Sequence, residues 1–110
     1  ADGEQSRDFV YVEDVVEVLH FALAAPIARG IFNLGTGRAR SFRDLARAVF
    51  EALDRPEAID WVPTPEAIRE NYQYFTEARM ERLRSEGWEA PFTGLEEGVR
   101  RTVERLVRAR

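Results

Sequence analysis

The chain has 110 residues, a length that fits one domain spanning 1–110, and its 45% apolar and 33% charged residues are typical of a globular protein. All 16 basic residues are arginine and cysteine is absent, which excludes disulfides, thiolate metal sites and lysine- or cysteine-based catalysis within these residues. The net charge of −4 disfavours nucleic-acid binding, the single histidine excludes a histidine-pair metal site, and no apolar run reaches the ~18 residues that span a membrane.

A strand followed by a helix is predicted near the start of the chain. Phe9–Val12 is β-branched and aromatic, a composition typical of a short strand. Asp14 precedes an apolar stripe and has Glu17 three positions later, a variant of the capping box that predicts a helix from about Val15. Pro26 ends this helix.

The same alternation is predicted a second time. Ile31–Leu34 is expected to form a strand that Gly35-Thr36-Gly37 closes. Ser41 with Asp44 repeats the capping pattern and predicts a helix that Pro56 ends.

The second half is predicted to hold one more strand and mostly helices. Ile59–Val62 is the third expected strand, and a loop with a helical turn near Glu66–Arg69 follows it. Helices are expected over Glu77–Glu86, capped by Thr76, and from Thr93, with Glu96 as its box partner, to about Arg108. Strands alternating with helices indicate an α/β fold with a small, partly parallel sheet, too thin to cover both of its own faces.

The glycine-rich turn Gly35-Thr36-Gly37 has two readings. It follows a strand and precedes a helix, where backbone N–H groups bind phosphate. A dinucleotide fingerprint, however, needs a third glycine where Arg40 stands, and a tight turn explains the glycines equally. Arg38 and Arg40 are expected to face solvent or to form ion pairs.

Two further segments are candidates for ligand binding. Arg7, beside Asp8 at the mouth of the first strand, offers a planar fork that grips phosphate oxygens, although a surface ion pair is the alternative. Asn71-Tyr72-Gln73-Tyr74-Phe75 lies in a proline-interrupted stretch, where aromatic hydroxyls orient polar ligands or close the core.

Other conspicuous residues are expected to be structural. Asp14 is interpreted as a helix cap, His20 as a surface or core-edge residue, and Trp61 and Trp88 as packing residues. The arginines of the last helix alternate with glutamates, which predicts a solvated face with i,i+4 ion pairs. No catalytic and no metal-binding residue is assigned.

Several motifs resemble one known family. Arg7-Asp8-Phe9-Val10-Tyr11-Val12-Glu13-Asp14-Val15 is similar to a segment of extended short-chain dehydrogenases that act on nucleotide sugars, as is Gly30–Gly37 followed by Ser41-Phe42. A narrower resemblance is to the carboxyl-terminal part of the ADP-L-glycero-D-manno-heptose 6-epimerase family. It is carried by these segments: Asn71–Thr76, Leu83-Arg84, Gly87-Trp88 and Pro91-Phe92.

The resemblance implies a substrate-binding lobe that works beside an NADP-binding Rossmann lobe absent from these residues. It implies that Arg7 and Tyr72 contact an ADP-sugar, that the complete enzyme inverts C6 of ADP-heptose for lipopolysaccharide core synthesis, and that the enzyme is a homo-oligomer, pentameric in the family. The family's glycine-rich loop and Tyr-x-x-x-Lys pair are missing, so we expect these residues alone to be inactive and to bind no cofactor.

Alternatives stay open at this point. The same lobe could belong to another nucleotide-sugar epimerase or dehydratase, or the chain could be a free-standing α/β binding module without enzymatic activity. The chain begins with Ala1 and shows no targeting segment, which favours a part of a longer cytoplasmic protein that binds neither membranes nor nucleic acids.

Overall fold

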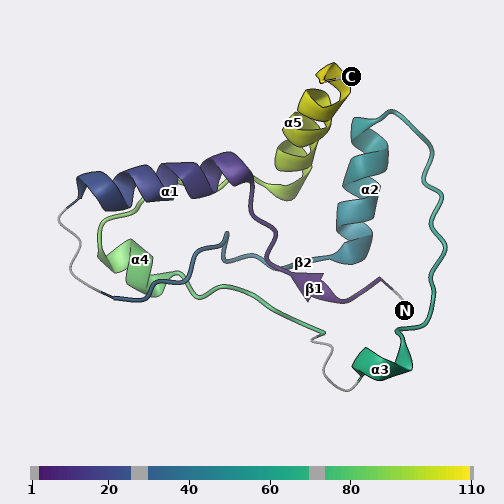
Figure 1. The fold of residues 1–110 in the computed structure, drawn as a ribbon, viewed down its shortest axis with the longest axis horizontal. Coiled ribbons are helices and arrows are strands. Elements are labelled where there is room, and N and C mark those ends of the chain that lie inside the picture. Colours follow the sequence, from purple (N-terminus) through teal and green to yellow (C-terminus); the bar gives the residue numbers. More distant parts are fainter. Residues whose placement is uncertain (1–2, 26–29, 70–73, 110) are drawn as a thin grey trace.

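The structure is a computed structural model that describes residues 3–25, 30–69 and 74–109. Within these ranges two short strands and five helices follow one another in a flat molecule of 48 × 39 × 20 Å. Figure 1 shows α1 extending to one side of the paired helices α2 and α5. The elements are β1 (Ser6–Arg7), α1 (Val12–Ala24), β2 (Arg40–Ser41), α2 (Phe42–Ala52), α3 (Glu66–Arg69), α4 (Glu81–Ser85) and α5 (Leu95–Arg108).

The sheet is small and mixed. β1 and β2 pair antiparallel, with Ser6 opposite Ser41 and Arg7 opposite Arg40. On the other side of β1, Ser6 forms an isolated parallel bridge with Phe75. The expected α/β class with a small, partly parallel sheet is therefore confirmed.

The positions predicted for the strands are wrong. Phe9–Val12, Ile31–Leu34 and Ile59–Val62 form no strand in the part of the chain that the structure describes, and Val12 is already the first residue of α1. A strand is held by hydrogen bonds to a neighbouring strand, and these extended apolar segments have no such neighbour here. Phe32 and Leu34 instead pack their side chains against the hydrophobic core.

Helix α1 begins earlier than expected. Its N-cap is Tyr11, which makes no side-chain capping bond, so the interpretation of Asp14 as a cap was wrong. The Asp14 carboxylate instead accepts hydrogen bonds from the backbone N–H (2.7 Å) and hydroxyl (3.0 Å) of Thr93. This contact joins the first turn of α1 to the residue two before α5.

Helix α2 begins as predicted. The Ser41 hydroxyl accepts from the Asp44 N–H at 3.0 Å, and the Asp44 carboxylate accepts from the Ser41 N–H, so the capping box is complete. The short helix α3 also lies where the sequence places it.

The last two helices follow the prediction in part. Thr76 caps no helix, because α4 begins only after Met80 and ends before Gly87, which has a left-handed φ of 103°. Helix α5 ends at Arg108 as expected, but its N-cap is Gly94 rather than Thr93. Thr93 lost the capping role because its hydroxyl bonds to Asp14.

The core lies between α1 and α4. Val18, Met80, Leu83 and Trp88 are its buried side chains, and Phe21 contacts Trp88 edge-on with ring centroids 5.4 Å apart. The packing role expected of Trp88 is confirmed.

Trp61 also packs, although it stays partly exposed. Its ring lies beside Gly3 and under the Arg43 guanidinium, 5.6 Å from the ring centroid.

Candidate functional site

Arg7 lies at the centre of the small sheet. One guanidinium nitrogen donates to the Ser6 carbonyl at 2.8 Å, and the guanidinium carbon lies 5.6 Å from the centroid of the Phe42 ring. The side chain is half-buried. The aromatic contact and the backbone bond hold the arginine stem in place, which lowers the entropy lost when it meets an anion.

The chain that follows the aromatic segment lies against the strand that carries Arg7. The Ser6 N–H donates to the Tyr74 carbonyl at 2.7 Å, and the Thr76 N–H donates to the Ser6 carbonyl at 3.0 Å. Residues 74–76 are therefore fixed within one residue of Arg7, although more than sixty positions separate them in sequence. Tyr72, the second expected contact, lies outside the described residues, as do Asn71 and Gln73.

A shallow hollow opens beside this segment. It is lined by Tyr74, Phe75, Thr76, Glu77 and Arg79, and the aromatic side chains at 74 and 75 are exposed. Aromatic faces beside charged side chains suit a ligand with both a ring and charged groups. Because Tyr74 and Phe75 are exposed, their placement favours the interpretation in which this segment borders a ligand site over the one in which it closes the core.

Asp8 holds the neighbourhood of Arg7 together. One carboxylate oxygen accepts from the Thr36 N–H (2.8 Å) and hydroxyl (2.6 Å), and the other accepts from the N–H groups of Gly37 (2.9 Å) and Ala78 (3.1 Å). Three segments distant in sequence thus meet on one carboxylate. These bonds hold the backbone of Asp8 in place, and with it the backbone of the neighbouring Arg7.

These hydrogen bonds also set the acidity of Asp8. Partial burial disfavours the charged form, but the bonds from Thr36, Gly37 and Ala78 outweigh it and lower the pKa of the carboxyl. Asp8 is consequently ionised wherever the fold is intact near neutral pH.

The glycine-rich turn is a structural turn and not a phosphate loop. The N–H groups of Thr36 and Gly37, which a phosphate would need, already donate to Asp8. A Cβ at Gly35 would lie 2.7 Å from both Ala78 Cβ and an Asp8 oxygen, and Gly37 has a φ of 78°. The residues present therefore do not fit the diphosphate of a dinucleotide at this turn.

The other charged residues behave largely as predicted. Arg38 is exposed, and Arg40 forms ion pairs with Asp44 (3.3 Å) and Glu96 (2.6 Å), so it links β2, α2 and α5. His20 is exposed on α1.

On α5 the expected ladder of i,i+3 and i,i+4 pairs is confirmed. Arg100 bonds to Glu97 and Glu104, and Arg101 bonds to Glu97. Hydrogen bonds from Arg100 lower the pKa of Glu97 to about 2.

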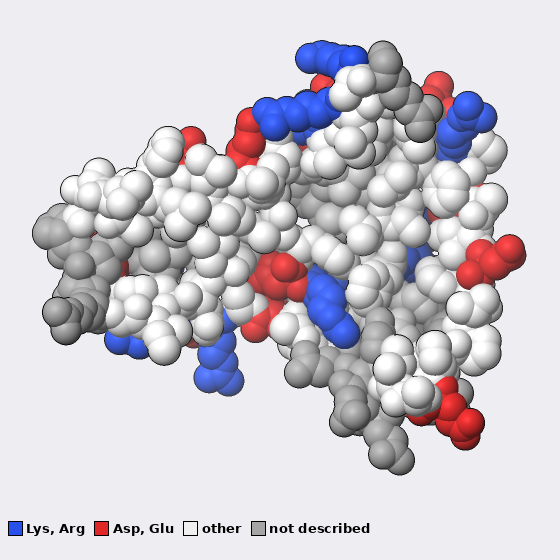
Figure 2. All heavy atoms as spheres, in the orientation of Figure 1, with Lys and Arg blue, Asp and Glu red and all other residues white. Residues whose placement is uncertain are grey.

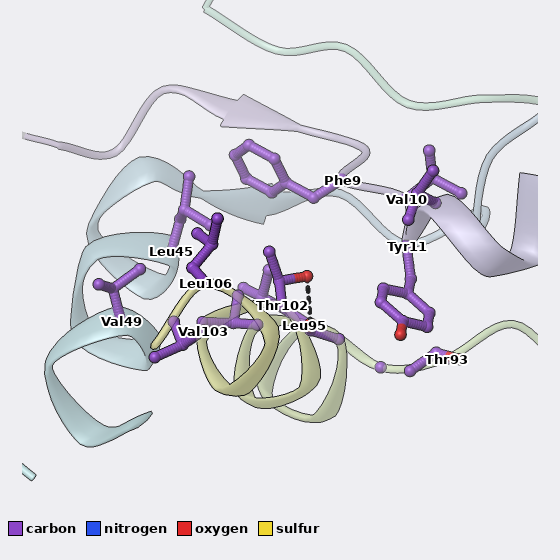
Figure 3. A pocket seen from close by; sticks show the side chains of 14 residues that line it. Phe9, Val10, Tyr11, Leu45, Val49, Thr93, Leu95, Thr102, Val103 and Leu106 are labelled. Atoms are coloured by element: carbon purple, nitrogen blue, oxygen red, sulfur yellow. Dashed lines mark hydrogen bonds between the residues drawn. The ribbon is translucent and has the colours of Figure 1, made fainter. Parts of the chain in front are cut away.

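A second hollow is an apolar groove of about 480 Å³ between the segment 9–12, α2 and α5. In Figure 3 the side chains of Phe9, Leu45, Val49 and Leu106 point into it from these three sides. The Thr102 hydroxyl at its edge donates to the Gly98 carbonyl within α5 at 2.8 Å. A groove with this lining suits an apolar partner and not a sugar nucleotide.

The described residues form neither a metal site nor a membrane span. Residues 3–25, 30–69 and 74–109 contain no group of three or more His, Cys, Asp or Glu side chains arranged to hold a metal ion. None of the helices in these same ranges has the length and apolar composition needed to cross a membrane.

The chain is similar in sequence to known epimerases. The sequence model of the NAD dependent epimerase/dehydratase family matches residues 1–35, which include β1, Asp8 and α1. Over 109 residues, or 99% of its length, the chain is 49% identical to an ADP-L-glycero-D-manno-heptose-6-epimerase of Nitratidesulfovibrio vulgaris (strain DP4). It is 47% identical over 105 residues to the protein of the same name from Fusobacterium nucleatum subsp. nucleatum.

Nearly the whole chain is similar to part of an ADP-heptose 6-epimerase. This confirms the resemblance predicted from the motifs. The chain spans about a third of the length of these curated relatives, 34% and 32% respectively.

Solved structures show the same fold. A UDP-glucose 4-epimerase from Thermotoga maritima, solved with UDP-glucose, matches 99% of the chain with a TM-score of 0.83 and 29% identity, over 34% of its own chain. A UDP-N-acetylglucosamine 4-epimerase from Methanobrevibacter ruminantium M1 matches the whole chain with a TM-score of 0.84, 20% identity and 34% of its own chain covered. The fold recurs in nucleotide-sugar epimerases that differ widely in sequence.

Sequence reasoning missed the role of Asp8. It treated Asp8 only as the neighbour of Arg7, whereas its partners are Thr36, Gly37 and Ala78. The one available signal was the glycine pair flanking Thr36, because a turn with free N–H groups attracts a carboxylate as well as a phosphate.

Proposed function

We propose that this chain is the nucleotide-sugar-binding part of an ADP-heptose 6-epimerase, acting together with a dinucleotide-binding lobe supplied by the rest of a longer polypeptide. The observation that carries the proposal is the 49% identity to a curated ADP-heptose 6-epimerase over 99% of the chain. The arrangement of Arg7, Asp8 and residues 74–76 supports it, because backbone hydrogen bonds of Ser6 hold a segment with two exposed aromatic side chains next to the strand that carries the Arg7 cation.

In this proposal Arg7 binds the diphosphate and Tyr72 contacts the sugar nucleotide. A guanidinium fork matches two phosphate oxygens at once and keeps its charge at every physiological pH. When Arg7 holds the diphosphate, the sugar stays free to turn between two orientations. The binding energy of the diphosphate then keeps the substrate in the site while the sugar carbon reacts. Asp8 fixes the backbone from which Arg7 extends.

The redox chemistry is assigned to the other lobe. The 110 residues contain no lysine, and the N–H groups of the glycine-rich turn are engaged by Asp8. No step of the hydride or proton transfer is therefore assigned to these residues. The family description supports a nicotinamide cofactor for the complete enzyme, and we propose NADP rather than NAD on the resemblance to the heptose epimerases.

The wider setting belongs to the same proposal. The resemblance favours a cytoplasmic homo-oligomer, pentameric in the family, whose product enters lipopolysaccharide core synthesis. A domain spanning 1–110 is proposed as the unit that binds substrate.

The test is Arg7→Ala in the complete polypeptide that carries these residues. Loss of a charge-assisted, two-pronged contact is expected to raise KM for ADP-heptose roughly tenfold to a hundredfold. Arg47→Ala is the matched control, since Arg47 forms a surface ion pair with Glu57 at 3.2 Å and lies on α2. Steady-state kinetics with both variants measure the difference, and circular dichroism shows whether each retains its helix content.

An Arg7→Ala variant that keeps both its fold and the wild-type KM would contradict the proposed role of Arg7. Arg7→Lys separates charge from geometry, because it keeps the cation and loses the fork. It is expected to lie between the wild type and Arg7→Ala.

A different nucleotide sugar is the second candidate. The Thermotoga maritima UDP-glucose 4-epimerase shares this fold at 29% identity, so the fold by itself does not select the substrate. Turnover of ADP-heptose is to be compared with that of UDP-, GDP- and dTDP-sugars by the complete enzyme. Preference for one of the latter would move the assignment to another epimerase or dehydratase.

A further inference from the structure

Gln5 is a buried polar residue at the start of the strand that carries Arg7. Only 8% of its surface is exposed. Among residues 3–25, 30–69 and 74–109, it is the one buried residue whose side chain ends in an amide or a charge. A side-chain amide has two N–H donors and a carbonyl acceptor, and buried groups of this kind normally have hydrogen-bond partners.

The described part of the protein supplies no partner for this amide. The main-chain carbonyl of Gln5 accepts from the Phe42 N–H at 2.9 Å, but none of the residues in the three described ranges hydrogen-bonds to the Gln5 side chain. An amide that is buried without partners destabilises a fold. This cost is offset when a bound ligand supplies the missing hydrogen bonds.

Gln5 lies on the same face of the sheet as Arg7. Side chains alternate along an extended strand, so positions 5 and 7 point to one face and position 6 to the other. The burial of the preceding residues follows this alternation, because Gly3 and Gln5 are buried and Glu4 between them is exposed. The bond from Phe42 to the Gln5 carbonyl extends the β1–β2 register by one residue, which places the Phe42 ring on this face beside Arg7.

The aromatic segment adds a phenol to the same face. Ser6 forms a parallel bridge with Phe75, and bridged residues share a face, so Tyr74 lies on the side of Gln5 and Arg7. Tyr74 is exposed and lines the shallow hollow described above. Two neighbouring segments thus present a cation, an amide and a phenol on one face.

The surroundings of the sheet suit a charged ligand that also carries hydroxyl groups. Figure 2 shows acidic and basic side chains over the region of β1 and β2, whereas the arm that holds α1 is mostly free of charge. Residues two apart on a strand are separated by about 6.6 Å, so Gln5 and Arg7 can bind adjacent groups of one molecule. An amide both donates and accepts, as a hydroxyl does, whereas a phosphate oxygen only accepts and suits the guanidinium of Arg7.

We propose that Gln5 binds a sugar hydroxyl next to the diphosphate of the nucleotide sugar, an inference that rests on the proposed function. Two sugars flank the diphosphate of ADP-heptose, so the hydroxyl belongs to the ribose or to the heptose. Gln5 then contributes to specificity, because an analogue that lacks this hydroxyl leaves the buried amide unpaired.

The test is Gln5→Met in the complete polypeptide. Methionine has a similar length and volume but lacks the donors and the carbonyl acceptor. KM for ADP-heptose is expected to rise about three- to tenfold with kcat within about twofold of the wild type, as for the loss of one binding contact. The free energy of unfolding of the ligand-free enzyme, measured in urea, is expected to stay the same or to rise, because an unpartnered amide has been removed.

ADP distinguishes the two sources of the hydroxyl, because it contains the ribose and the diphosphate but no heptose. If the inhibition constant of ADP rises in Gln5→Met together with KM, the hydroxyl is on the ribose. If only KM rises, the hydroxyl is on the heptose. Both results support the proposal.

A second variant and a control make the result specific. Gln5→Glu keeps the shape of the side chain but replaces the donors by a negative charge beside the diphosphate, so KM is expected to rise further than in Gln5→Met. Thr102→Val is the matched control, since it removes a polar group that already bonds to the Gly98 carbonyl within α5 at 2.8 Å, and it is expected to leave both constants unchanged.

Two results would overturn the proposal. One is a wild-type KM and a wild-type inhibition constant in both Gln5 variants. The other is a lower stability of ligand-free Gln5→Met, which would assign the amide to a partner within the polypeptide.

Failure here differs from failure of the proposed function. If the complete enzyme turns over another nucleotide sugar instead, and Gln5→Met raises KM for that sugar, the heptose assignment fails and the role of Gln5 stands. If ADP-heptose turns over and both Gln5 variants keep the wild-type constants, the epimerase assignment stands and the role of Gln5 falls.

Discussion

The carboxylate of Asp8 accepts hydrogen bonds from both the backbone N–H and the hydroxyl of Thr36, 28 positions along the chain. Its second oxygen accepts from the N–H groups of Gly37 and Ala78. A turn whose glycines suggest a phosphate loop is thus occupied by a side chain of the protein itself.

Asp8→Asn is expected to lower the free energy of unfolding by about 2–4 kcal/mol, because an amide nitrogen would face N–H donors and leave them unsatisfied. Urea denaturation of the 110-residue chain at neutral pH measures the change. Asp60→Asn is the matched control, since the Asp60 side chain is exposed. If both substitutions change the free energy of unfolding by the same small amount, Asp8 does not stabilise the fold as proposed.

Acid should weaken the fold through the same residue. The pKa of Asp8 is lower in the folded chain than its usual value, so its contribution is complete above that value and is lost as the pH falls through the folded pKa. The stability gap between wild type and Asp8→Asn is therefore expected to narrow below about pH 4. Glu97, whose pKa is about 2, titrates in both proteins and cancels in the difference. A gap that stays constant from pH 7 to pH 2.5 would contradict this.

Gly35→Ala tests how closely the turn packs. The new Cβ would lie 2.7 Å from Ala78 Cβ and 2.7 Å from an Asp8 oxygen, so a cost of about 2–3 kcal/mol is expected. At Gly94 an added Cβ meets nothing within 4 Å, and Gly94→Ala should cost under about 1 kcal/mol through the N-cap preference alone. Thermal unfolding of both variants gives the comparison, and similar melting temperatures would show that the turn can shift.

Ser41→Ala removes one half of the capping box of α2. The Asp44 N–H loses its acceptor at 3.0 Å, and the expected cost is about 1 kcal/mol. Ser41→Asp restores an acceptor and is expected to recover most of the loss. Hydrogen exchange at the first turn of α2 reads out the cap directly, and unchanged exchange in Ser41→Ala would show that the cap contributes nothing.

The helices were predictable because their signals are local. The capping box at Ser41 lies at the start of α2, and the apolar spacing of α5 recurs within that one helix. The strands were not, since Ile31–Leu34 holds three apolar residues, one of them β-branched, but finds no neighbouring strand among the described residues. Residue types in a segment indicate its preference for extended backbone, whereas strand pairing depends on which other segment the fold places beside it.

The candidate site was predictable only at the level of residue type. Arg7 was identified from its chemistry, but its proximity to residues 74–76 depends on hydrogen bonds between distant segments. Asp14 shows the opposite error: an acidic residue near a helix start resembled a cap, and its true partner, Thr93, lies 79 positions away. Local patterns cannot distinguish a capping carboxylate from one that ties two distant segments together.

The order of synthesis gives these two aspartates a further significance. Asp8 and Asp14 are translated before their partners, because Ala78 and Thr93 follow 70 and 79 residues later. Neither carboxylate can complete its bonds until those partners have left the ribosome, so both remain hydrated while the intervening residues are made. The contacts of these two acids with Ala78 and Thr93 are therefore late steps in the folding of this region.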